Sequence, residues 1–173
     1  MTEEDEIQTE RLLVVVDESL GTKRAVDYVA RMLGRRRGFH VCLLHLLPPL
    51  PPELLEFGGA ESPQKEKALV AELRLDQKAW IASAKGSVRP ALDDAIKALH
   101  VAGISSHAID LGYCDPMDSR DTAVAVLEQA RAKQCHTIVI GHESHFWFHK
   151  LAGSHLAEHL LRHASEVTIW VVQ

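Results

Sequence analysis

The sequence is short of cysteine. Its 173 residues include only three, Cys42, Cys114 and Cys135, which lie far apart and form no CxxC pair. This spacing argues against a disulfide framework, and it suits the reducing conditions of the cytosol. Cys42 falls in the middle of an apolar run, so we expect it to be an inert thiol in the core. We therefore expect a cytoplasmic protein.

Long apolar runs and basic stripes are also missing. No run approaches the roughly 20 residues of a membrane-spanning helix, and the only dense cationic run is Arg35-Arg36-Arg37. Five of the 24 acidic residues lie in the first ten positions, which leaves 19 acidic and 19 basic side chains in the rest. We therefore expect no membrane or nucleic-acid partner and no signal peptide. We expect an acidic disordered leader at residues 1–10 and a single domain at residues 11–173.

Catalytic motifs are absent as well. The chain contains no HExxH, GxSxG, Walker A or GxGxxG sequence, each of which carries a specific catalytic or phosphate-binding role. Ser154 precedes His155, but a serine that opens a helix usually caps it by accepting N–H bonds from the first turn. The sequence therefore predicts a protein that has no catalytic residues and is not an enzyme.

What the chain does have is a regular alternation of strand and helix signals. Short apolar β-branched runs alternate with segments whose apolar residues recur at helical spacing, which is typical of an α/β fold with a parallel sheet covered on both faces. A break at Gly86 and Pro90 predicts a kink or two consecutive helices within the longest helical segment, whose apolar stripe is Leu69, Leu73, Trp80 and Ala84. The expected strands are 12–16, 41–47, 104–111, 137–140 and 167–172, and the expected helices are about 25–33, 63–100, 121–130 and 154–163. Gly34 is expected to end the first helix and Ser62 to cap the second, while Ser119 is an alternative start for the third.

Two residues directly follow expected strands and mark a candidate binding crevice. Asp17 follows the first strand and Gly141 follows the fourth. In open parallel sheets, ligands bind at the carboxyl ends of the strands. After Gly141 come eleven residues and then Gly153-Ser154, where a helix begins, and free N–H groups at a helix N-terminus can hold a phosphate. Asp17 could instead be a turn or cap residue.

Three sequence segments resemble the universal stress protein family. Residues 17–25 read DESLGTKRA, similar to the family's D-G-S-x-x-S-x-x-A with Glu18 in place of glycine. Residues 45–48, at the end of the second strand, read HLLP and are similar to the H-V that the family has at the same place. Residues 160–164 resemble the family's C-terminus. The resemblance implies a three-layer α/β/α sandwich with a five-stranded parallel sheet of order 3-2-1-4-5, the adenine nucleotide alpha hydrolase-like, Rossmann-like fold. It also implies a stress-response protein with an unidentified regulatory partner. A homodimer is implied through the edge strand five, at Val167, Ile169, Trp170 and Val171.

The resemblance also bears on nucleotide binding. Nucleotide-binding members of the family carry G-x-x-G-x9-G-[ST] after strand four, but here Ser144 stands at the second glycine and Gly153-Ser154 arrives one residue early. Any Cβ crowds a backbone that must approach a polyphosphate. His142 and the Phe146-Trp147 pair instead resemble the universal stress protein A branch, which is held not to bind ATP. We expect no tight ATP binding. The alternative is an ATP or AMP site formed by Asp17, Gly141, Ser144, Gly153 and Ser154.

A weaker alternative is metal binding by histidines. His155, His159 and His163 recur four residues apart on the last helix, and such a pair can share a zinc ion. No closed set of ligands accompanies them. The more economical interpretation is that these histidines flank an apolar helix face.

Overall fold

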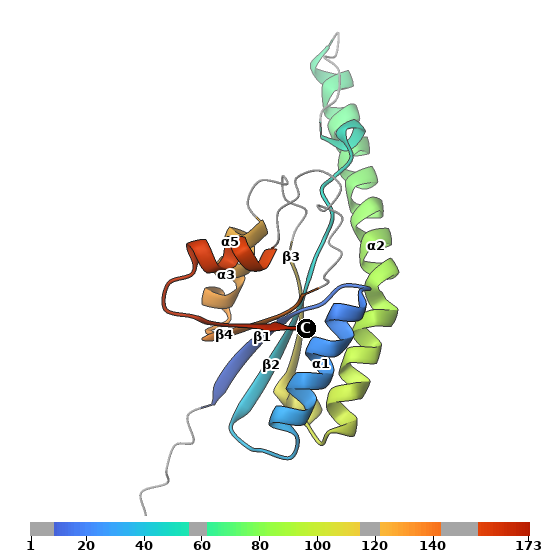
Figure 1. The fold of residues 1–173 in the computed structure, drawn as a ribbon. Coiled ribbons are helices and arrows are strands. Elements are labelled where there is room, and N and C mark those ends of the chain that lie inside the picture. Colours follow the sequence, from blue (N-terminus) through green and yellow to red (C-terminus); the bar gives the residue numbers. More distant parts are fainter. Residues whose placement is uncertain (1–8, 56–61, 115–121, 143–155) are drawn as a thin grey trace, which may run out of the picture.

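The computed structural model describes residues 9–55, 62–114, 122–142 and 156–173. Five parallel strands form one sheet in the order β3-β2-β1-β4-β5, with helices on both faces (Figure 1). The α/β sandwich and the strand order predicted above are therefore confirmed. The strands are β1 (Glu10–Val15), β2 (Phe39–Leu46), β3 (Ile109–Cys114), β4 (Thr137–Gly141) and β5 (Thr168–Val172).

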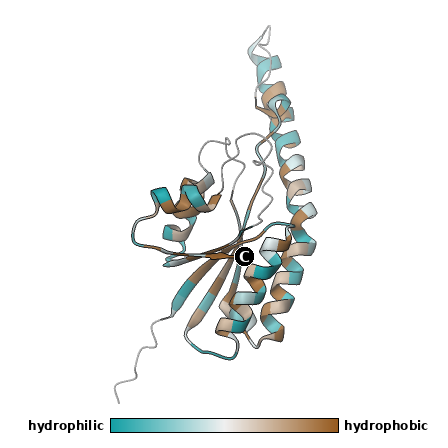
Figure 2. Cartoon of the chain, viewed as in Figure 1, coloured by the Kyte–Doolittle hydropathy of each residue, from teal (hydrophilic) through white to brown (hydrophobic). Residues whose placement is uncertain are grey.

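The central strands are apolar on both faces because both faces are covered. Four successive residues of β1, from Leu12 to Val15, are buried, and the strands are among the most apolar segments of the chain (Figure 2). β1 begins at Glu10, which pairs with Phe39 of β2, so the first strand includes the last residue of the segment expected to be a leader. Residues 1–8 lie outside the described part of the chain.

Two helices cover one face of the sheet. Helix α1 (Leu20–Leu33) begins after Ser19, whose hydroxyl accepts a hydrogen bond from the N–H of Thr22, and it ends at Gly34. A Cβ on Gly34 would lie 2.8 Å from the carbonyl oxygen of Ala30, which explains why a glycine stands there. Helix α2 (Pro63–Val101) begins after the predicted cap Ser62.

Helix α2 is one continuous helix of 39 residues, so the prediction of two consecutive helices is wrong. Gly86 and Pro90 both lie on its exposed side, where the carbonyl that Pro90 leaves without its usual N–H partner can be solvated by water. The buried residues of α2 all lie in its C-terminal part, from Val88 to Leu99.

The N-terminal half of α2 projects beyond the sheet (Figure 1). None of the predicted stripe residues is therefore buried: Leu69 is exposed, and Leu73, Trp80 and Ala84 are partly exposed. The short 3₁₀ helix η1 (Pro52–Leu54) lies against this half, where the carbonyl of Leu54 accepts a 2.7 Å hydrogen bond from Gln77.

The other face is covered by α3 (Thr122–Ala132) and α5 (Leu156–His163). Leu160 of α5 is fully buried in the cluster that these helices form with the sheet. The third strand starts five residues later than predicted because η2 (Ser106–Ala108), capped by Ser105, occupies the preceding residues. Within the described residues, the structure has no helix with the length and apolar character of a membrane span.

Candidate functional site

The candidate site lies where the strand order reverses. β2 and β4 both pair with β1, on opposite sides of it, so the connections that leave β1 and β4 diverge to opposite faces of the sheet. Ligands of doubly wound α/β proteins bind at such a point, outside the carboxyl ends of the strands. Asp17 follows β1 there and Gly141 ends β4, so the structure brings these two predicted site residues to the same edge.

Asp17 is held in a compact hydrogen-bonded turn at the start of α1. Its Oδ1 accepts hydrogen bonds from the N–H and hydroxyl of Ser19 and from the hydroxyl of Thr22. The N–H of Asp17 in turn donates to Thr22 Oγ1 at 3.0 Å. One carboxylate oxygen therefore organises the turn that carries the chain from β1 into α1, which is a structural role.

The second carboxylate oxygen of Asp17 has no such role. Asp17 is only 6% exposed, and among the described residues its Oδ2 has no hydrogen-bond partner. A buried acceptor without a partner is costly, so such an atom needs a water or a ligand donor. Asp17 thus combines a structural oxygen with an acceptor that is available to a ligand.

Gly141 is explained by packing. A Cβ at this position would lie 2.1 Å from the backbone carbon of Gly21 and 2.3 Å from its oxygen. The last residue of β4 and the first turn of α1 therefore approach each other so closely that neither a ligand nor a special backbone angle is needed to account for this glycine.

A groove between α1 and α2 adjoins this turn. One part, a cavity of about 520 Å³, includes Asp17 in its wall. Its charged lining comprises the carboxylates of Asp17, Glu18, Asp27 and Asp94 and the ammonium groups of Lys23 and Lys97. Among the described lining residues, carboxylates outnumber cations, and this excess of negative charge disfavours a polyphosphate.

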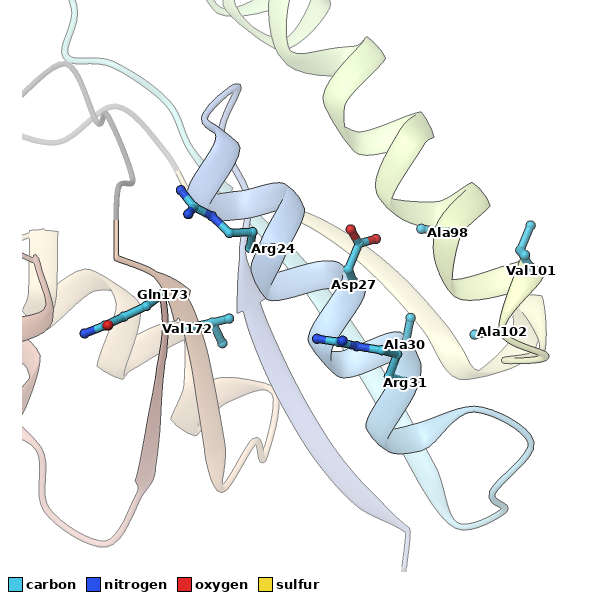
Figure 3. A pocket seen from close by; sticks show the side chains of 9 residues that line it. All are labelled: Arg24, Asp27, Ala30, Arg31, Ala98, Val101, Ala102, Val172 and Gln173. Carbon is cyan, nitrogen blue, oxygen red and sulfur yellow. The ribbon is translucent and has the colours of Figure 1, made fainter.

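A second part of the groove, about 550 Å³, runs along α1 to the end of β5 (Figure 3). Asp27, Ala98 and Val101 line both parts, so the two cavities are neighbours. Arg24 and Arg31 add positive charge from α1 at this end.

His45 ties β2 to the end of β1. Its Nδ1 lies 2.7 Å from the carbonyl oxygen of Val16, which makes that nitrogen the donor. Burial lowers the pKa of His45 despite this bond and the nearby Asp17 carboxylate, so the ring is neutral at physiological pH. The ring also contacts Tyr113 edge-on, with centroids 6.4 Å apart.

Several predicted residues fall outside the described part of the chain. These are Ser144, Gly153 and Ser154 of the glycine loop, and His155 of the histidine stripe. His159 and His163 lie on α5, half-buried and exposed respectively. In the described segments, the residues close enough to share a metal ion are instead His40, Cys42 and Asp110. They lie toward the amino-terminal ends of β2 and β3, away from the strand ends that carry Asp17.

Cys42 lies in the core, as the sequence predicted, but a charged side chain that the sequence did not predict lies beside it. Cys42 is fully buried, and its Sγ lies 3.3 Å from the guanidinium of Arg11. The only sequence signal was weak: Arg11, Cys42 and Asp110 occupy early positions in three strands that proved to be neighbours.

Strand β5 lies at the edge of the sheet, where only one of its sides is paired. The N–H of Thr168 donates to the carbonyl of His136 at 2.8 Å, and the carbonyl of Val172 accepts from the N–H of His142 at 2.7 Å, so both groups point toward the β4 side. Because backbone groups alternate in direction along a strand, those of Ile169 and Val171 point to the open edge.

The side chains predicted for the interface have different surroundings. Val167 and Ile169 pack against the core on the α3 and α5 face. Trp170 packs on the other face, where its ring meets Tyr28 of α1 edge-on with centroids 5.7 Å apart. Val171 is 37% exposed. The open edge therefore presents backbone groups and Val171, while Trp170 is already engaged within the chain.

The chain matches one protein family over nearly its whole length. The model of the universal stress protein family matches residues 8–173. None of the curated proteins compared with the chain matches it.

Solved structures share its fold. One from the universal stress protein family of Burkholderia pseudomallei is 20% identical, with 96% of this chain and 97% of that chain covered and a TM-score of 0.57. A universal stress protein in complex with cAMP is 16% identical, with 95% and 96% covered and a TM-score of 0.55. The universal stress protein from Archaeoglobus fulgidus in complex with dAMP is 17% identical, with 96% and 99% covered and a TM-score of 0.55.

Proposed function

Because the chain belongs to the universal stress protein family, we propose that it is a non-enzymatic, cytoplasmic stress-response protein that acts as a homodimer and does not bind ATP tightly. It acts through contacts with a regulatory partner. We also propose that the chain belongs to the universal stress protein A branch of the family, which the sequence around Gly141-His142 and Phe146-Trp147 supports.

The observation that carries the proposal is the charge around Asp17. Among the described residues, the wall of the cavity that includes Asp17 has four carboxylates and two lysines. A triphosphate brings three to four negative charges, and its binding needs donors or cations that outweigh them. Gly141, the described glycine of the candidate phosphate loop, is required for packing against Gly21, so it is not evidence for a phosphate site.

A second candidate function is binding of an adenine nucleotide through its base. The unpartnered Oδ2 of Asp17 favours it, because a buried acceptor fits the exocyclic amino group of adenine. The structural relatives in complex with cAMP and dAMP support the same ligand class. Asp17 would hold the base, and Gly141, Ser144, Gly153 and Ser154 would lie toward the phosphate.

Calorimetric titration with ATP and AMP, with and without magnesium, separates the two candidates. We expect no submillimolar ATP binding by the wild type. Asp17→Asn is the sharpest variant, because the amide oxygen can still accept from Ser19 and Thr22 while the amide nitrogen replaces the free acceptor with a donor. Submillimolar ATP binding that Asp17→Asn abolishes, in a variant with unchanged circular dichroism, would refute the first candidate and establish the second.

The homodimer is proposed to form by antiparallel pairing of two β5 edges. An exposed, unpaired strand edge is a template for association, and pairing it with a second copy removes that hazard. The outward backbone groups of Ile169 and Val171 would form the hydrogen bonds, and Val171 would contribute the exposed apolar surface.

Light scattering on two variants of one residue tests this interface. Val171→Pro removes an N–H that points to the open edge and leaves the hydrogen bonds to β4 intact, so we expect a monomer. Val171→Ala keeps that N–H and should remain dimeric. A Val171→Pro variant that is as dimeric as wild type means that the β5 interface is wrong, and a monomeric wild type removes the dimer altogether.

A further inference from the structure

A cluster of ionisable groups lies at the amino-terminal edge of the sheet, opposite the edge that carries Asp17. The register pairs Arg11 of β1 with His40 of β2, and Cys42 of β2 with Asp110 of β3. Cys42 belongs to the same face of the sheet as α3 and α5, where Cys135, in the turn between α3 and β4, also packs. The proposed function uses none of these residues.

The contacts form a connected network. Arg11 Nη2 lies 2.9 Å from Asp110 Oδ2 and 3.3 Å from Cys42 Sγ. Its Nε donates to the carbonyl oxygen of Lys133 at 2.7 Å, which holds the guanidinium in place. His40 Nε2 lies 2.9 Å from the same oxygen of Asp110 in an ion-pair contact that does not have hydrogen-bond geometry.

The two thiols differ in their protonation. A hydrogen bond from Cys135 and the positive charge of Arg11 outweigh burial and lower the pKa of Cys42 to about 6. The same hydrogen bond and burial raise the pKa of Cys135. The contact with Arg11 at 3.3 Å is on Cys42, so a positive charge lies beside the sulfur whose pKa is lowered, and a thiolate is favoured at Cys42 over Cys135.

A metal ion is the competing occupant of this cluster. The ligand atoms of His40, Cys42 and Asp110 lie within 4.8 Å of one another. However, the Arg11 guanidinium is already in contact with two of those three ligands. A fixed positive charge there neutralises the anions and repels a second cation, so the network favours a stabilised thiolate.

We propose that Cys42 is a hydroperoxide-reactive thiolate that forms a disulfide with Cys135. In the first step the Cys42 sulfur attacks one oxygen of the hydroperoxide, the O–O bond breaks, and the products are Cys42 sulfenic acid and hydroxide or the corresponding alkoxide, which takes up a proton. In the second step the Cys135 sulfur displaces the hydroxyl group from Cys42, the S–S bond forms, and water leaves with the proton of the Cys135 thiol.

The surface above Cys42 controls access. Cys42 itself is fully buried, whereas the side chains of Arg11 and Asp110 over it are 26% and 45% exposed. The ion pair is held only weakly at the more exposed Asp110, so a swing of the Asp110 carboxylate away from the anchored Arg11 admits a small oxidant without unfolding the sheet.

The test uses the full-length protein treated with hydrogen peroxide and analysed by intact mass and by non-reducing peptide mapping. We expect a Cys42–Cys135 disulfide. In Cys135→Ser, whose hydroxyl still donates a hydrogen bond, we expect Cys42 sulfenic acid that dimedone traps. Cys114→Ser removes a buried thiol at the carboxyl end of β3 and is the matched control, which should oxidise like wild type.

The rate tests the role of Arg11. A lowered pKa increases the fraction of Cys42 that is thiolate at pH 7, and the accompanying loss of nucleophilicity offsets only part of that gain. Arg11→Lys should keep most of this advantage, and Arg11→Gln should slow oxidation at pH 7 and move its pH profile upward. An unoxidised Cys42, a disulfide that involves Cys114, or an Arg11→Gln profile identical to wild type would each overturn the proposal.

Discussion

Replacing Gly141 with alanine should destabilise the protein because β4 and α1 leave no room for a methyl group. The added Cβ would lie 2.1 Å from the backbone carbon of Gly21, 2.3 Å from its oxygen and 2.7 Å from its Cα. Ordinary carbon contacts are about 3.5 Å or longer, so the first turn of α1 must shift by more than an ångström. The atoms in the way are backbone, so no rotamer change relieves the overlap.

Overpacking of a well-packed core typically costs about 1–3 kcal/mol. We expect Gly141→Ala to reach the upper end of this range, because the shift also disturbs the turn in which Asp17 accepts from Ser19 and Thr22. Against a typical stability of about 5–15 kcal/mol, such a loss is large and easily measured.

Gly86→Ala is the matched control for the same chemical change. Gly86 is exposed in the middle of α2, and an added Cβ would meet no atom within 4 Å. Alanine is favoured over glycine in a helix interior by about 1 kcal/mol, so this variant should be more stable than wild type.

Urea unfolding followed by circular dichroism gives both free energies. The two variants should move the midpoint in opposite directions, with a difference between them of about 4 kcal/mol. A Gly141→Ala variant as stable as wild type would refute the packing explanation of this glycine, and Gly141 would then again be a candidate for the phosphate loop.

Two further predictions concern the core and the cluster at Cys42. Leu160→Ala should cost about 2–5 kcal/mol because Leu160 is fully buried, whereas Leu161→Ala, at a residue that is 63% exposed, should change the unfolding free energy by less than about 0.5 kcal/mol; equal effects in urea unfolding would contradict the packing of α5. Folding lowers the pKa of Cys42 from 9.0 to about 6, so its contribution to stability is absent below pH 6, grows as the pH rises and is complete above pH 9. Cys42→Ser should flatten this rise, and an unchanged pH profile would count against the lowered pKa.

The sequence by itself determined the features that depend on neighbouring residues. The alternation of apolar strand runs with helical periodicity specified the α/β sandwich, and the cap Ser62 and the stop at Gly34 were predicted at the residues where the structure has them. Asp17 was placed at the end of β1 for the same reason, since strand ends are local signals. The strand order came from the family resemblance, because periodicity does not state which strands are neighbours.

Tertiary structure alone decided the features that depend on distant residues. The stripe of α2 looked like a buried face, but the N-terminal half of that helix extends past the sheet, and Leu69 is 38% exposed. The glycine at position 141 is explained by its close contact with the backbone of Gly21, without a bound phosphate. Cys42 looked inert until Arg11 and Asp110, which are 31 and 68 residues away in sequence, came within reach of its sulfur. A sequence pattern reports which side of an element is apolar, whereas packing brings together the groups that set a thiol's charge or exclude a methyl group.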